Sequence, residues 1–188
     1  RALKVWCVHF GTPCSRWSRA RTRARADSSV DTLGMRCASA TVRLLRECLE
    51  AKVWFTIENP ASSQLWSYPP LARLLRRSGA VNAIFPMCRF GADYAKSTRI
   101  SGTLPGLQKL DCRCRCALPH EHVNGMAVFE TGGVRKTVWK TSLAGKYPPA
   151  LCRSLGALLA DVAPVGAWRP KGEAEVLPGW ARSLGAAT

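Results

Sequence analysis

Three short apolar runs alternate with two helical patterns along the first half of the chain. The runs at 3–10, 53–57 and 81–85 are rich in Val, Ile, Phe and Trp, which is typical of strands buried on both faces. The patterns at 39–51 and 70–79 carry apolar residues at the three- and four-residue spacing of an amphipathic helix. This order predicts an α/β fold of Rossmann-like type, with a mostly parallel sheet and crossover helices.

Residues with strong positional preferences mark the ends of the predicted helices. Ser39 is a suitable N-cap for the first helix, because its hydroxyl can accept a hydrogen bond from a free backbone amide. Pro70 opens the second helix, and Ser78 with Gly79 ends it. A third helix is predicted after Pro149, which stands near its first turn.

The second half of the chain changes character. From about 102 to 145 the sequence contains short β-like pieces at 126–130 and 134–139, which indicates a β-rich, irregular insertion. The segment 164–188 is rich in Gly, Pro and Ala, so we expect a flexible tail. The length favours a single domain, which we place over 1–163.

A thiol and a carboxyl group follow the first two apolar runs. Cys14 stands in the polar stretch 11–18, and Glu58 follows the run 53–57. Right-handed crossovers bring the loops after successive parallel strands to one edge of a sheet, so we expect both groups to face one small ring. A thiolate can add reversibly to carbon 6 of a pyrimidine, and a carboxylic acid can protonate the ring nitrogen that gains charge.

Three segments, in order along the chain, resemble the DNA (cytosine-5) methyltransferases. Residues 11–18, Gly-Thr-Pro-Cys-Ser-Arg-Trp-Ser, are similar to the nucleophile loop of that family, in which a Ser stands four residues after the Cys of a Pro-Cys pair. Residues 57–59, Ile-Glu-Asn, look like its Glu-Asn element, and 90–98 is similar to its aromatic-Gly segment. The resemblance extends over about 3–163 and points to a divergent branch seen in viral and mobile-element contexts.

The resemblance implies a reaction and a set of site residues. It assigns Cys14 as the nucleophile that adds to cytosine and Glu58 as the residue that binds and protonates the base, before methyl transfer from S-adenosylmethionine. The implied substrate contacts are Pro13, Arg16, Ser18, Arg19, Asn59, Arg89, Lys96 and Thr98. Ser15, Pro60, Tyr94 and Thr98 depart from the family's pattern.

The resemblance also suggests that part of the family's fold is missing. The Gly-rich turn that opens the family's cofactor site has no counterpart upstream of Leu3, so we expect the catalytic part of a methyltransferase fold without its cofactor-binding part. The alternative hypothesis is a non-catalytic, basic nucleic-acid-binding remnant of that fold.

The charge balance favours a polyanionic partner. The chain has 28 Lys and Arg against 12 Asp and Glu, a formal net charge of +16. Each phosphate neutralised by such a surface releases condensed counterions, so nucleic acid is the expected partner, and the resemblance favours DNA over RNA.

Five arginines make a basic loop after Cys14. This loop either contacts phosphates or is a disordered arm, and its arginines are Arg16, Arg19, Arg21, Arg23 and Arg25. No apolar stretch approaches the roughly 20 residues of a membrane helix, so no membrane partner is expected.

The nine cysteines have two interpretations. We expect reduced thiols and an intracellular, reducing compartment, with the nucleus and the cytoplasm both open, because no signal peptide precedes them. The cluster at 112–122 contains thiols and imidazoles of the kind that zinc binds, but its alternating spacing is unusual for a zinc finger. We therefore predict a basic loop without metal, and keep four candidate zinc ligands: Cys112, Cys116, His120 and His122.

Overall fold

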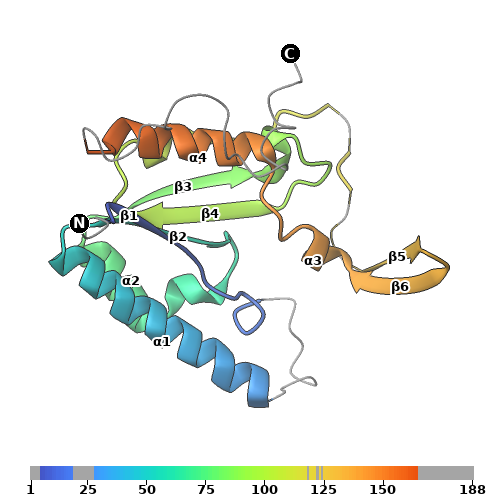
Figure 1. The fold of residues 1–188 in the computed structure, drawn as a ribbon, viewed down its shortest axis with the longest axis horizontal. Helices are drawn as coiled ribbons and strands as arrows, with labels where there is room; N and C mark the ends of the chain where they lie inside the picture. The colour runs from blue at the N-terminus through green and yellow to red at the C-terminus, as the bar shows by residue number, and fades with distance from the viewer. Residues whose placement is uncertain (1–4, 19–27, 118, 122, 124, 165–188) are drawn as a thin grey trace.

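The chain folds around a four-stranded sheet covered by helices on both faces. The computed structural model describes residues 5–18, 28–117, 119–121, 123 and 125–164, so Arg19, His122 and the predicted tail over 165–188 lie outside the described residues. Figure 1 shows α1 and α2 over one face of the sheet and α4 over the other. The helices are α1 (Ser28–Glu50), α2 (Pro69–Arg77), α3 (Lys140–Leu143) and α4 (Pro149–Val162), with short 3-10 turns η2 (Gln64–Ser67), η3 (Met87–Phe90) and η4 (Leu107–Leu110).

The sheet is mixed, which corrects the prediction of a mostly parallel one. Its strands are β1 (Cys7–Gly11), β2 (Trp54–Pro60), β3 (Val81–Pro86) and β4 (Ser97–Gly102), in the order β1-β2-β4-β3. β1 and β2 pair in parallel, whereas β4 lies antiparallel between β2 and β3. The α/β class is therefore confirmed. The sequence did not reveal β4 because Ile100 is its one apolar residue, so no apolar run marks it.

The first helix starts earlier than predicted. α1 begins at Ser28, so Ser39 is not an N-cap but lies within the helix, where its hydroxyl is 3.3 Å from that of Tyr68. The buried stripe of α1 includes Gly34 and Ala38 as well as Val42 and Leu45. Small residues give a weak hydrophobic signal but allow close packing, which explains why the sequence pattern placed the helix start too late.

Alternate residues of the strands serve two separate cores. Phe55 and Ile57 of β2 pack beneath α1 and α2, together with Val8 and Phe10 of β1. The core on the opposite face is built from β3, β4, η4 and α4, and Cys7 packs against it. Because side chains alternate along a strand, Thr56 and Glu58 of β2 face the α4 side.

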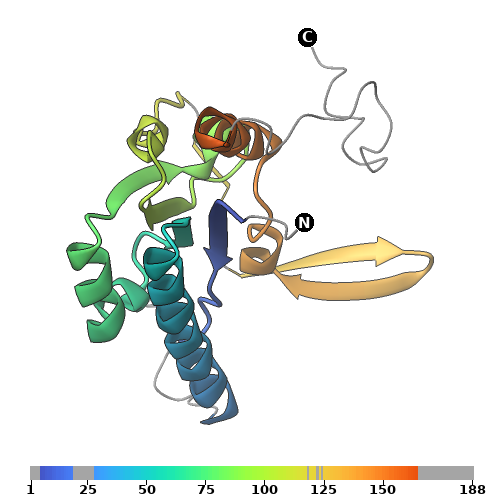
Figure 2. The ribbon, with the colours of Figure 1, turned by 60° about the vertical axis from the view of Figure 1, so that its left-hand side comes forward.

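A two-stranded hairpin forms a second, separate sheet. β5 (Met126–Thr131) pairs antiparallel with β6 (Val134–Trp139), which confirms the predicted β pieces at 126–130 and 134–139. Figure 2 shows the hairpin projecting away from the rest of the fold. Its base is closed where the Lys140 amide donates to the Gly125 carbonyl oxygen over 3.0 Å.

Two further findings concern the chain as a whole. All nine cysteines lie among the described residues, and all are free thiols. Within the described ranges, no helix combines the length and the apolar character needed to cross a bilayer.

Candidate functional site

The parallel pairing of β1 with β2 sets the two candidate segments side by side. Gly11, three residues before Cys14, is the register partner of Glu58. Glu58 and Asn59 lie inside β2 rather than just past its end, which corrects the predicted strand boundary. The Asn59 side-chain amide donates to the Thr12 carbonyl oxygen over 2.7 Å, and this bond ties the thiol segment to the Glu-Asn segment.

A second attachment holds the far end of the thiol segment. The Gln64 backbone amide donates to the Trp17 carbonyl oxygen over 2.9 Å, and the Trp17 backbone amide donates to the Cys14 carbonyl oxygen over 2.9 Å. Trp17 is buried and its ring lies 5.4 Å from that of Tyr68. The segment is thus fixed by its backbone and by one aromatic side chain, while Cys14 itself is exposed.

Glu58 carries a buried carboxyl group that is incompletely bonded. Its side chain is 9% exposed, and its Oε1 atom has no hydrogen-bond partner. Burial raises the pKa of the Glu58 carboxyl, whereas the Lys96 ammonium and the Tyr147 hydroxyl lower it and offset part of the shift. A carboxyl group in this setting favours its protonated form.

A chain of hydrogen bonds leads from this carboxyl group along the α4 face of the sheet. Tyr147, just before α4, interacts with Glu58, and its hydroxyl is 2.9 Å from His9 Nε2. The other ring nitrogen of His9 is 2.8 Å from the Thr56 hydroxyl. Sequence reasoning missed His9 and Thr56, although each is a polar residue inside an apolar run, a pattern that indicates polar partners at one sheet face.

The remaining predicted substrate residues lie in different surroundings. Lys96 is next to Glu58, and its ammonium also donates to the Ala144 carbonyl oxygen over 3.1 Å. Thr98 has no exposed surface and its hydroxyl faces the Lys96 carbonyl oxygen, so it offers nothing to a ligand in this conformation. Arg89 is exposed on η3, beside Cys114.

Residues of the thiol segment differ in accessibility. Pro13 is exposed and Ser18 is half-buried. The Arg16 guanidinium lies 5.3 Å from the centroid of the Trp17 ring, and its aliphatic part packs against Gly34 of α1. Arg16 therefore covers the helix rather than extending into solvent. Of the five arginines in the predicted basic loop, only Arg16 lies among the described residues.

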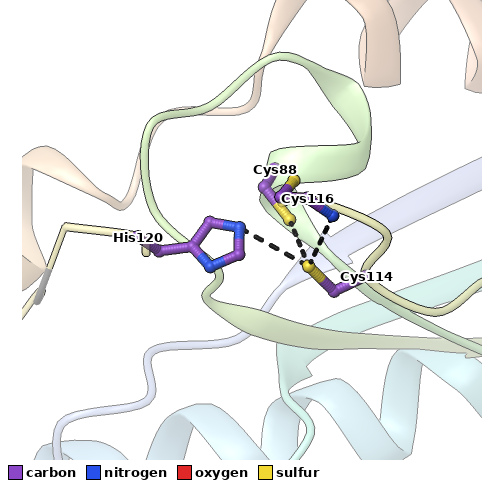
Figure 3. Close-up of side chains that lie close together, drawn as sticks. All are labelled: Cys88, Cys114, Cys116 and His120. Atoms are coloured by element: carbon purple, nitrogen blue, oxygen red, sulfur yellow. Dashed lines mark hydrogen bonds between the residues drawn. The ribbon is translucent and has the colours of Figure 1, made fainter. Parts of the chain in front are cut away.

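The structure regroups the candidate metal ligands. Cys88, Cys114, Cys116 and His120 place their ligand atoms within 4.8 Å of one another (Figure 3). Cys112 packs instead against the core beneath α4. Sequence reasoning missed Cys88, which stands directly after β3 and far from the 112–122 cluster in the chain.

The described residues do not fit S-adenosylmethionine. A Gly-rich turn between a strand and a helix would cradle such a cofactor, and none follows β1, β2 or β3. The two best-formed cavities of the described part have volumes of about 200 and 120 Å³. Both are smaller than the roughly 300 Å³ that cofactor pockets need.

Comparison with protein-family models, with curated proteins and with solved structures finds no match for this chain.

Proposed function

We propose that this chain is a DNA (cytosine-5) methyltransferase-like domain in which Cys14 adds to the ring of a cytosine and Glu58 protonates it. The observation that carries the proposal is the buried Glu58 carboxyl group, whose pKa burial raises, on the strand that pairs in parallel with β1, the strand that leads to the exposed Cys14 thiol. Methyl transfer from S-adenosylmethionine is implied by the resemblance alone.

The chemistry of a protonated carboxyl group suits the edge of a cytosine. Such a group offers one O–H donor and one acceptor oxygen. Cytosine presents the N4 amino donor beside the N3 acceptor, so one carboxyl group can make both hydrogen bonds. Burial keeps the pKa of Glu58 raised, which favours the protonated form that this pairing needs.

The addition step balances without any cofactor. The Cys14 thiol loses its proton to solvent, and its sulfur forms a bond to carbon 6 of the ring. The electron pair of the C5–C6 double bond moves into the ring, and N3 takes the proton of Glu58. Carbon 5 thereby becomes nucleophilic. Elimination of the sulfur reverses each of these changes.

The net charge of +16 supports a nucleic acid as the carrier of the cytosine. DNA is favoured over RNA by the resemblance. The alternative, a non-catalytic basic binding domain, shares this charge and predicts binding without covalent chemistry.

An isotope-exchange experiment distinguishes these functions. The chain is incubated with an oligodeoxynucleotide that carries tritium at cytosine carbon 5, without a methyl donor. Addition at carbon 6 lets carbon 5 take a solvent proton, so elimination releases tritium into water. We expect release with the wild type, none with Cys14→Ser, and a decrease of at least about 100-fold with Glu58→Gln.

Cys37→Ser is the matched control, because Cys37 is a half-buried thiol on α1. It should release tritium like the wild type. Salt-sensitive binding of the oligonucleotide without tritium release would reject the addition step and support the non-catalytic alternative. The same experiment with an RNA oligonucleotide decides between the two nucleic acids.

A further inference from the structure

Four side chains outside the proposed site converge beside the end of β3. Cys88 lies on η3, Cys114 and Cys116 lie in the segment after η4, and His120 follows them. Figure 3 shows the four residues gathered around the Cys114 sulfur, which Cys88, His120 and the Cys116 backbone amide all face. We propose that this Cys3His cluster binds one zinc ion as a structural site.

The spacing of the ligand atoms matches a tetrahedral ion. Zn–S bonds of about 2.3 Å and Zn–N bonds of about 2.0–2.1 Å imply S···S separations of about 3.8 Å and S···N separations of about 3.6 Å. The Sγ atoms of Cys88 and Cys114 are 3.7 Å apart, and Cys114 Sγ is 3.5 Å from His120 Nε2. Two ligand pairs are therefore already at the separations that the ion requires, and the other ligand atoms lie within 4.8 Å.

The same distances favour a single ion over a multinuclear metal centre. The three cysteines of the cluster are free thiols. All four ligand atoms lie within 4.8 Å of one another, which leaves room for one ion but not for several. Thiolate and imidazole ligands in tetrahedral arrangement select zinc among the common divalent ions.

The surroundings also suit anionic sulfur. The Cys116 backbone amide is 3.5 Å from Cys114 Sγ and can donate to it. Three thiolates and one neutral imidazole around Zn²⁺ carry a net charge of −1. Arg89, Arg113 and Arg115 adjoin the ligands in sequence and can balance that charge.

A metal here would secure an otherwise weakly attached segment. Residues 111–117 contain no helix or strand. The segment is joined to β3 by two bonds, from the Cys112 backbone amide to the Ile84 carbonyl oxygen over 3.2 Å and from the Ile84 backbone amide to the Asp111 carboxylate over 2.9 Å. Beyond it, the Glu121 backbone amide donates to the Asp93 carbonyl oxygen over 3.0 Å. Four protein ligands and no carboxylate indicate a closed, structural site rather than a catalytic one.

Metal analysis of the full chain tests the proposal. The chain is produced in zinc-supplemented medium, purified without a metal-binding tag, and analysed by mass spectrometry of its metal content. We expect about one zinc per chain, and tetrahedral cobalt–thiolate absorption after exchange with Co²⁺. Cys114→Ser should lower the zinc affinity by at least about 100-fold.

Cys112→Ser is the matched control, since Cys112 neighbours the ligands in sequence but packs beneath α4. It should keep its zinc. His120→Cys preserves a ligand and should also keep zinc, whereas His120→Ala should not, so the test remains decisive even if Cys114→Ser fails to fold. A wild-type chain without zinc that also fails to bind Co²⁺, or equal zinc loss in Cys112→Ser and Cys114→Ser, would overturn the proposal.

Discussion

Glu58 illustrates how a single buried group couples stability to pH. Burial raises the pKa of its carboxyl above the ordinary value of 4.5, so the folded chain holds this proton more tightly than the unfolded chain does. This contribution to stability is fully present below the pKa that Glu58 has in the unfolded chain, and it is lost as the pH rises through the pKa of Glu58 in the folded chain.

The prediction is a pH-dependent difference between the wild type and Glu58→Gln. As the pH rises from about 4 to about 8, the wild type should lose free energy of unfolding relative to Glu58→Gln, which has no proton to lose at this position. Urea unfolding of both proteins at a series of pH values measures the difference. A difference that grows in favour of the wild type would mean that Lys96 and Tyr147 outweigh desolvation.

Local sequence identified part of the candidate site. Cys14 and Glu58 could be proposed because each follows or ends a short apolar run, and their segments do lie on neighbouring parallel strands. The contact of Glu58 with Tyr147, and through Tyr147 with His9, could not be predicted. Tyr147 and His9 are 138 positions apart in the chain and meet through the packing of α4 on the sheet. Cys88 was missed for the same reason, since a 3.7 Å contact with Cys114 spans 26 positions.

At the scale of elements, one glycine controls how closely two strands approach. Gly102 ends β4 against β2, and a Cβ atom there would collide with the Phe55 carbonyl oxygen and lie 2.8 Å from Thr56 Cα. Backbone atoms of a central strand cannot move aside cheaply. We expect Gly102→Ala to lower the free energy of unfolding by at least about 1–3 kcal/mol.

Gly156 provides the matched comparison on α4. It is exposed within the helix, and an added Cβ would have no neighbour within 4 Å. Gly156→Ala should therefore raise the free energy of unfolding by about 0.5–1 kcal/mol, because alanine loses less backbone entropy in a helix. Chemical denaturation measures both variants, and equal effects of the two substitutions would contradict the strand-packing argument.

Elements with a strong periodic signal were predicted well. α2, α4 and the strands of the hairpin were recognised from apolar spacing and from prolines at helix starts. α1 was cut short because Gly34 and Ala38, which it buries before Val42, are small, and β4 was missed because it is mostly polar. In both α1 and β4, tertiary packing stabilises an element that the local sequence pattern does not predict.

At the scale of the whole molecule, the sheet order places one strand between the two proposed sites. The candidate site lies at the ends of β1 and β2, whereas the Cys3His cluster lies beside η3, which follows β3, and β4 stands between β2 and β3. Strand order is not encoded in local periodicity, so the class of the fold could be predicted but its topology could not. The zinc proposal and the addition step use different side chains, so each can be tested with its own variants.

The projecting hairpin leads to a prediction about the whole chain. Residues 126–139 project from the fold, and a backbone hydrogen bond between Lys140 and Gly125 joins the two ends of this hairpin. Replacing 126–139 by a two-glycine linker should leave the four-stranded sheet intact. Circular dichroism and a cooperative unfolding transition measure the outcome, and loss of that transition would show that the hairpin contributes to the main core.

The narrow base of the hairpin also makes it a natural insertion point. Gly125 and Lys140, where the chain enters and leaves the hairpin, are hydrogen-bonded to each other. A binding loop, an epitope or a small reporter domain can therefore replace 126–139 without changing the connections between the strands of the main sheet. The molecule can thus gain or lose a peripheral module while its central scaffold keeps the same connections.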